Sequence, residues 1–149
     1  MLASGRFSIH HIGLAVADIE TARQVYVDRF GYEVCSPIIH DPVQTAYVQF
    51  LRLPNDGVYL EFIAPDSPQS KLSAFVKKGG GLNHVCYAVE DIESAVLDLR
   101  NQDMMALCDP VPAVAFPGRR IAWMMGMDMQ PVEFVERGAG SDSVPLLGA

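Results

Sequence analysis

Apolar and polar residues follow two spacings at the start of the chain, and each spacing predicts a different element. Residues 8–16 alternate in polarity and are rich in β-formers, which favours a half-buried strand. Residues 19–30 place apolar side chains at helical spacing, and Asp18 is suited to cap this helix. The same spacing places Phe30 on the packed face of the helix and Arg23 in solvent. We therefore expect a helix that packs on a sheet.

Three further strands are predicted after this helix. They cover residues 32–39, 45–53 and 58–64. The sequence Pro54-Asn-Asp-Gly57 separates the last two of them and is a strong hairpin signal. The first half of the chain is therefore predicted to run β-α-β-β-β.

The second half repeats this order after a short linker. Turn-forming residues bracket a helix predicted at 69–78. Asp91 can then cap a helix from residue 92 to about 102, and a loop is expected at 111–118, where prolines remove donors from any ladder. The strands predicted around them cover residues 82–89, 105–108, 120–125 and 132–136.

A chain of 149 residues with half of them apolar is the size of one typical domain. We predict a single α+β domain built from two βαβββ modules. The first module covers about 8–65 and the second about 82–137. A linker helix at about 66–81 joins them, and a loose C-terminal tail at 138–149 follows.

The two modules share sequence as well as pattern. The residues HIGLAVADIETA from position 11 return as HVCYAVEDIESA from position 84, an offset of 84 − 11 = 73. Later, LEFI around Glu61 returns as VEFV around Glu133, an offset of 133 − 61 = 72. Such self-similarity indicates an internal duplication. Each half therefore carries one His on its first strand and one Glu on its last.

These four repeated residues, His11, Glu61, His84 and Glu133, are a candidate metal site. A carboxylate among apolar strand residues must point to water or into a functional cavity. A single strand His or Glu is more often structural, but independent core residues have no reason to recur as the same pair. Two imidazoles and two carboxylates suit zinc, nickel, cobalt, manganese or iron(II), with positions left open for a substrate.

Charge and hydropathy exclude several classes of partner. The chain has 11 Lys and Arg against 18 Asp and Glu, a formal charge of −7, which repels nucleic acid and anionic membranes. No apolar run approaches the roughly 20 residues that span a bilayer, and the first residues lack the features of a signal peptide. We therefore expect a cytoplasmic protein that binds neither nucleic acid nor membrane.

The cysteines, Cys35, Cys86 and Cys108, are odd in number and widely spaced. This arrangement argues against both a disulfide framework and a thiolate zinc cluster. We expect them to pack as small apolar residues.

Two stretches of the chain resemble a known family. HIGLAVADIE at 11–20 is similar to the vicinal oxygen chelate superfamily, which includes glyoxalases, bleomycin-resistance proteins and dioxygenases. The longer stretch at 64–92, APDSPQSKLSAFVKKGGGLNHVCYAVEDI, resembles the methylmalonyl-CoA epimerases of that superfamily. The resemblance implies a glyoxalase-like fold, with two βαβββ modules pairing around a central metal. The family's metal-ligand positions match His11, Glu61, His84 and Glu133.

The resemblance also implies an activity. It points to a metal-dependent isomerase or lyase that abstracts a proton next to a carbonyl, with methylmalonyl-CoA epimerase as the nearest named activity. The cofactor would be divalent cobalt, manganese, nickel or zinc, and the substrate a small molecule such as an acyl-CoA thioester. Glu133 would move the proton and Gln44 would donate a hydrogen bond to the substrate. A homodimer is expected on the same basis.

The chain departs from the epimerase pattern at two places, which keeps alternatives open. Some epimerases carry an acid on a strand where this chain has Gln44 or the nearby Gln49. A family segment before the last strand is replaced by MGMDMQP at 125–131. Arg119 and Arg120 are candidates for binding an anionic substrate group, or they lie on a solvated turn. The alternatives are a glyoxalase I-type lactoylglutathione lyase, a protein that binds an antibiotic or natural product, and a pathway-specific enzyme.

Overall fold

A computed structural model describes residues 6–138 of the protein, and these residues divide into two compact units. One unit comprises residues 11–83, and the other comprises residues 6–10 with 84–138. The predicted division into modules, linker and tail stays a prediction. Residues 139–149 of the predicted tail lie outside the described part.

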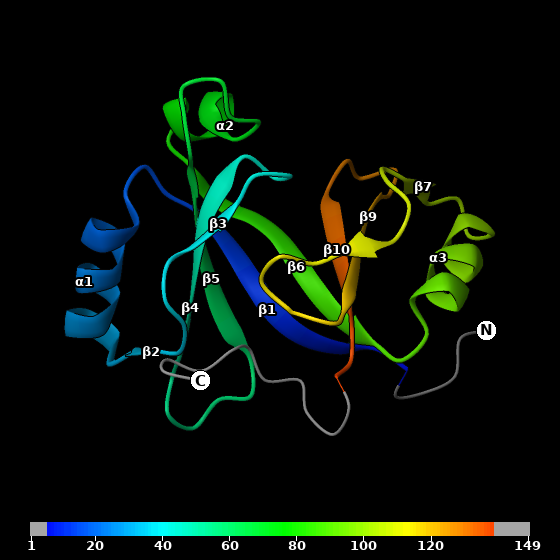
Figure 1. The fold of residues 1–149 in the computed structure, drawn as a ribbon, viewed down its shortest axis with the longest axis horizontal. Coiled ribbons are helices and arrows are strands. Elements are labelled where there is room, and N and C mark those ends of the chain that lie inside the picture. Colours follow the sequence, from blue (N-terminus) through cyan, green and yellow to red (C-terminus); the bar gives the residue numbers. More distant parts are fainter. Residues whose placement is uncertain (1–5, 139–149) are drawn as a thin grey trace. The chain divides into compact units, whose positions relative to one another are not determined.

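The unit of residues 11–83 contains a mixed sheet covered by one helix (Figure 1). Its strand order is β2-β4-β5-β1, with β3 paired to β4. Strand β5 runs antiparallel to β4, as the predicted hairpin requires, and parallel to β1. The elements are β1 (Ser8–Ala15), α1 (Ile19–Phe30), β2 (Glu33–Val34), β3 (Ile39–Asp41), β4 (Ala46–Arg52), β5 (Tyr59–Pro65) and α2 (Ser73–Lys77).

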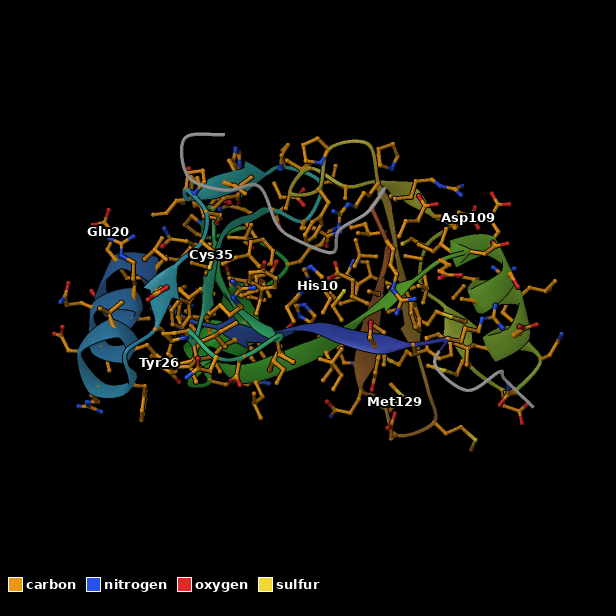
Figure 2. All side chains as sticks on the ribbon, turned by 90° about the horizontal axis from the view of Figure 1, so that it is seen from below. His10, Glu20, Tyr26, Cys35, Asp109 and Met129 are labelled. Atoms are coloured by element: carbon orange, nitrogen blue, oxygen red, sulfur yellow. The ribbon has the colours of Figure 1, made fainter. Side chains whose placement is uncertain are left out.

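Helix α1 begins and ends where the sequence predicts. The Asp18 carboxylate accepts a hydrogen bond from the Thr21 amide at 2.8 Å, which caps the first turn. Gly31 ends the helix in the left-handed region at φ 77°, a conformation that costs glycine little. Glu20 is exposed, whereas Tyr26 is half-buried with its ring 5.1 Å from that of Phe62 (Figure 2). The helix thus covers the sheet face that carries Phe62.

Two predictions about α1 are wrong. The Phe30 side chain is 59 % exposed, because it lies on the last turn beyond the edge of the packed face. Arg23 is half-buried, and its guanidinium donates to the Gln49 side chain at 2.9 Å. The long Arg side chain reaches back over the sheet, which helical spacing alone does not reveal.

The strand predicted at 32–39 is broken into β2 and β3. Ser36 lies between them, and its hydroxyl accepts the Phe50 amide hydrogen bond at 3.0 Å in place of a backbone carbonyl. The next residue, Pro37, has no amide hydrogen to continue the ladder. The linker helix predicted at 69–78 is also shorter, since turns occupy residues 67–72 before α2.

The other unit repeats the same plan. Its strand order is β6-β10-β9-β7, with β8 paired to β9; β6 runs parallel to β10, and β9 antiparallel to it. The elements are β6 (Gly81–Val89), α3 (Ile92–Arg100), β7 (Met105–Ala106), β8 (Val111–Pro112), β9 (Arg120–Met125) and β10 (Pro131–Glu136). Helix α3 is capped by Asp91, whose carboxylate accepts from the Ser94 amide at 3.0 Å.

Beneath α3 lies an apolar core that includes Ile92, Val96, Met124 and Phe134. The loop predicted at 111–118 is partly wrong, because its first two residues form β8. Proline removes a donor but keeps its carbonyl, so it is tolerated on this short edge strand.

Each unit thus carries a sheet with a helix on one face, which confirms the predicted α+β fold class. None of the helices described between residues 6 and 138 has both the length and the apolar character needed to cross a bilayer.

Candidate metal-binding pairs

In the unit of residues 11–83, one His and one Glu lie together on the sheet face opposite α1. The neighbours of Glu61 along β5, Leu60 and Phe62, pack beneath α1, so the side chain of Glu61 points to the other face. The His11 Nε2 atom lies 3.5 Å from Glu61 Oε1. Both residues are buried, and the sheet register pairs Glu61 with Gly13 on β1 and Phe50 on β4.

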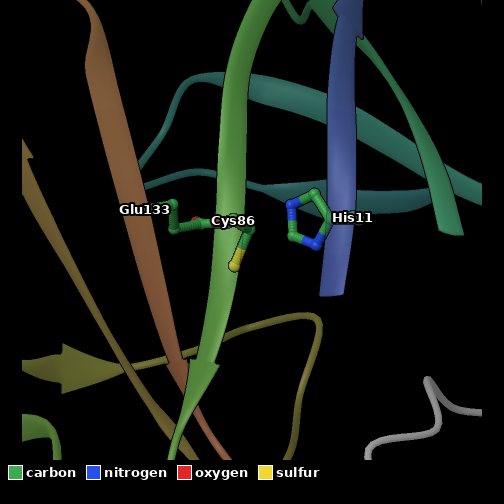
Figure 3. A group of neighbouring side chains, drawn as sticks. All are labelled: His11, Cys86 and Glu133. Atoms are coloured by element: carbon green, nitrogen blue, oxygen red, sulfur yellow. The ribbon is translucent and has the colours of Figure 1, made fainter. Parts of the chain in front are cut away.

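The other unit contains the equivalent pair. The His84 Nε2 atom lies 3.7 Å from Glu133 Oε1, and both side chains are more than nine-tenths buried. The register pairs Glu133 with Cys86 on β6 and Trp123 on β9. Figure 3 shows Glu133 on β10 and Cys86 on the adjacent strand β6, together with His11 on β1.

The spacing within each pair fits two ligands of one divalent ion. Imidazole nitrogens and carboxylate oxygens bind zinc at about 2.0–2.2 Å, which places two such atoms about 3.0–3.5 Å apart. The observed 3.5 Å and 3.7 Å are close to this range and long for a direct hydrogen bond. Each pair also offers nitrogen and oxygen donors in a buried setting, as a catalytic metal site requires. Both His–Glu pairs are therefore suited to bind a divalent metal.

Glu133 is electrostatically unusual. Burial raises the pKa of the Glu133 carboxyl, and the facing His84 and the Cys86 thiol oppose only part of this rise. The thiol is close, since ligand atoms of Cys86 and Glu133 lie within 4.8 Å of each other. A carboxyl of this kind takes up a proton more readily than an exposed glutamate does.

An aromatic ring stands against the His in each pair. The Phe50 ring lies edge-on to His11 with centroids 5.3 Å apart, and the Trp123 ring lies edge-on to His84 at 4.7 Å. Packed rings of this kind restrict the rotamers of the imidazoles and thereby hold the ligand nitrogens in place.

The two glutamines considered from the sequence lie in different environments. Gln49 lies on the α1 face of its sheet, where its amide accepts from Arg23 and donates to the Ser36 carbonyl at 3.0 Å. It therefore points away from the His11–Glu61 pair. Gln44 is half-buried in the turn between β3 and β4, and its backbone amide donates to Asp41 at 3.1 Å.

The two arginines are held by neighbours within their own unit. Arg120 lies on the α3 face, since Ala122 and Met124 follow it at two-residue spacing and pack in that core. Its guanidinium binds Glu136 at 2.9 Å and Glu93 at 2.9 Å. Arg119 lies just before β9, with its guanidinium 5.8 Å from the centre of the Phe116 ring. Arg120 thus already pairs with two carboxylates of its own unit.

Sequence reasoning missed two residues beside Glu133. Cys86 was expected only to fill space, although it lies two positions after His84 and so shares its strand face. That two-residue spacing could have revealed Cys86. The position of Trp123 depends on the pairing of β9 with β10, which leaves no local signal in the sequence.

The chain is similar to known proteins over most of its length. Residues 10–123 match the model of the Glyoxalase/Bleomycin resistance protein/Dioxygenase superfamily. The chain is 30 % identical to the ethylmalonyl-CoA/methylmalonyl-CoA epimerase of Cereibacter sphaeroides over 122 residues, which covers 80 % of this chain and 89 % of that protein.

The chain is also 33 % identical to mouse mitochondrial methylmalonyl-CoA epimerase over 103 residues. This match covers 68 % of the chain and only 56 % of the mouse protein, so the chain spans about half the length of that relative. The structure of methylmalonyl-CoA epimerase from Mycobacterium tuberculosis shares the fold, with a TM-score of 0.82 and 24 % identity over 94 % of this chain and 95 % of that one. The predicted resemblance is confirmed: the chain belongs to the glyoxalase/bleomycin resistance protein/dioxygenase superfamily.

Proposed function

We propose that the protein is a metal-dependent isomerase that abstracts a proton next to a carbonyl, with the activity of a methylmalonyl-CoA epimerase. His11, Glu61, His84 and Glu133 together would hold one divalent ion of cobalt, manganese, nickel or zinc. The observation that carries the proposal is the duplicated His–Glu pair, at 3.5 Å in one unit and 3.7 Å in the other, each on the face opposite a helix. The names of the relatives support the choice of substrate.

The reaction requires a carbon acid to lose and regain a proton between a thioester carbonyl and a carboxylate. When bound, the divalent ion supplies Lewis-acid stabilisation of the negative charge on the substrate oxygens. Glu133 would take the proton as carboxylate and return it as carboxylic acid, and burial favours that uptake by raising its pKa. Gln44 would donate a hydrogen bond from its side-chain amide to the substrate.

A glyoxalase I-type lyase is the second candidate, because the same His and Glu set would serve a hemithioacetal substrate. Proton abstraction next to a carbonyl is common to both reactions, so the four ligands do not distinguish them. We also propose, from the resemblance, that the protein is a homodimer, and, from its sequence pattern, that it acts in the cytoplasm. Light scattering coupled to size-exclusion chromatography tests the homodimer through its mass.

The metal is tested first, by elemental analysis of the purified wild-type protein beside His84→Ala and Glu133→Gln. We expect about one divalent ion per chain, as four ligands at one site would give, and a weakened or lost ion in both variants. Glu136→Gln is the matched control, because Glu136 lies on the same strand but on the α3 face. If the wild-type protein stays metal-free after reconstitution with each of the four metals, the metal-dependent proposal fails.

The substrate is tested next with metal-loaded protein in deuterated water. Methylmalonyl-CoA should exchange its α-proton for deuterium, which mass spectrometry of the thioester detects. The hemithioacetal of methylglyoxal and glutathione is the parallel substrate. Exchange of methylmalonyl-CoA alone supports the epimerase, turnover of the hemithioacetal alone supports the lyase, and no reaction with either contradicts both.

A further inference from the structure

The indole nitrogen of Trp123 is a buried donor that the described protein leaves unused. Its Nε1 atom is shielded from solvent, and within residues 6–138 no acceptor lies in hydrogen-bond range of it. Buried donors are nearly always paired in folded proteins, since an unpaired one loses its hydrogen bonds to water without replacement. Such a group therefore indicates an acceptor that comes from a bound molecule.

The place of Trp123 relates this donor to the metal-binding pair of its unit. Strand register sets Trp123 directly across from Glu133, so both side chains project from the face opposite α3. The indole ring also lies edge-on to the imidazole of His84, with centroids 4.7 Å apart. The unused N–H group thus belongs to the same patch of sheet as the pair.

The other unit provides a natural comparison. The residue across from Glu61 is Phe50, whose ring packs against His11 at 5.3 Å. A phenyl ring is therefore sufficient to pack against the imidazole and needs no hydrogen bond. The extra feature of Trp123 is the N–H group, whose burial has a cost that the protein itself does not offset.

We propose that the Trp123 indole N–H donates a hydrogen bond to an oxygen of the bound substrate, and so orients the substrate beside Glu133. This inference rests on the proposed function, because it takes the substrate to be an oxygen-rich acyl thioester. Two of its oxygens could accept the bond, one on the thioester carbonyl and one on the neighbouring carboxylate. Trp123 would then be a substrate-binding residue of the unit that holds Glu133.

Nuclear magnetic resonance provides a direct test, because Trp123 is the chain's single tryptophan. Metal-loaded wild-type protein labelled with nitrogen-15 tryptophan should give one indole N–H signal. Adding methylmalonyl-CoA should move the indole proton downfield and slow its exchange with water. Propionyl-CoA keeps the thioester but lacks the carboxylate, and malonate supplies carboxylates without a thioester, so these probes identify the accepting oxygen.

Kinetics of Trp123→Phe provide the second readout. The substitution keeps an aromatic ring, as in the other unit, and removes only the donor and part of the ring. We expect kcat/KM for α-proton exchange to fall by about three- to tenfold if the thioester carbonyl accepts the hydrogen bond, and by more if the charged carboxylate accepts it. Tyr87→Phe is the matched control, because Tyr87 contributes to the core beneath α3 on the opposite face. Its kinetics should equal those of the wild type.

The outcomes separate this inference from the proposed function. Turnover of methylmalonyl-CoA with a downfield indole shift supports both. Turnover without that shift, and with unchanged kinetics in Trp123→Phe, overturns the role of Trp123 alone. A shift with malonate in a protein that turns over no thioester supports the donor and contradicts the epimerase. If no probe moves the signal and no thioester reacts, both are wrong.

Discussion

The His11–Glu61 and His84–Glu133 pairs occupy equivalent places in their units, but the residues beside them differ in polarity. Glu61 is flanked in the register by a glycine, Gly13, and by Phe50. Glu133 is flanked instead by the Cys86 thiol and the Trp123 indole, both hydrogen-bond donors. Duplication thus preserved the potential metal ligands, while the register neighbours of the carboxylate differ between the two units. The two carboxylates therefore lie in surroundings of different polarity.

The helix-covered faces of the two units differ as well. In one unit β4 and β5 pair Tyr47 with Ala64. The positions that correspond through the repeat hold Arg120 and Glu136, which form hydrogen bonds at 2.9 Å and 3.2 Å. An uncharged pair and an ion pair therefore occupy the same place in a duplicated scaffold. The Arg120–Glu136 pair should therefore make the stability of its unit depend on pH.

The largest expected difference is between Glu133→Gln and Glu61→Gln. With excess metal present, Glu133→Gln should slow α-proton exchange by about 10²–10⁴-fold, because an amide cannot take up the proton. Glu61→Gln should slow it by only about 10–100-fold, through weaker metal binding. Deuterium incorporation into methylmalonyl-CoA measures both rates, and equal losses would remove the functional distinction between the two carboxylates.

The next effect concerns the cores, where the two units should behave alike. Phe62 and Phe134 are buried equivalents beneath α1 and α3, with exposures of 0 % and 2 %. Replacing either by Ala should lower the free energy of unfolding by about 3–5 kcal/mol. Urea unfolding measures this loss. The control is Phe30→Ala, an exposed position, which should change the free energy of unfolding by under about 0.5 kcal/mol. A loss confined to one of the two core variants would contradict equivalent packing.

A smaller effect is expected at the position where glycine in one unit is replaced by cysteine in the other. Cys86→Ala removes a fully buried thiol beside Glu133 and should destabilise the metal-free protein by about 1–2 kcal/mol. Cys108→Ala changes a half-buried thiol and is the control. Guanidinium unfolding of both variants compares them, and equal stabilities would show that the Cys86 thiol adds no stability beside Glu133.

The smallest effect is a pH dependence on the α3 face. Hydrogen bonds from Arg120 lower the pKa of Glu136 below its usual value. A lowered folded-state pKa adds stability that is complete above the unfolded pKa of about 4.3 and is lost as pH falls through the folded pKa. Glu136→Gln should therefore flatten the loss of thermal stability below about pH 4.3. If the melting temperature of the variant falls with decreasing pH as it does in the wild type, this carboxylate contributes nothing to acid stability.

Much of the local structure could be predicted from the sequence because its causes are local. Asp18 and Asp91 cap their helices through residues three positions away, and the hairpin between β4 and β5 follows from its turn residues. The break at Ser36 was missed, because the Ser36 hydroxyl accepts its hydrogen bond from the backbone amide of Phe50, 14 residues further along the chain. The short β8 was missed for a similar reason, since it depends on pairing with β9.

The repeated order of elements and the two His–Glu sets could be predicted from the amino-acid sequence, because strand and helix periods and internal repetition can be read without a partner segment. The approach of Glu61 to His11, and of Glu133 to His84, becomes visible only in the folded chain. The fold also places Trp123 and Cys86 on either side of Glu133 and turns Arg120 toward α3. The physical reason is that strand register joins residues far apart in the chain, and a shift of one residue would turn every side chain to the other face.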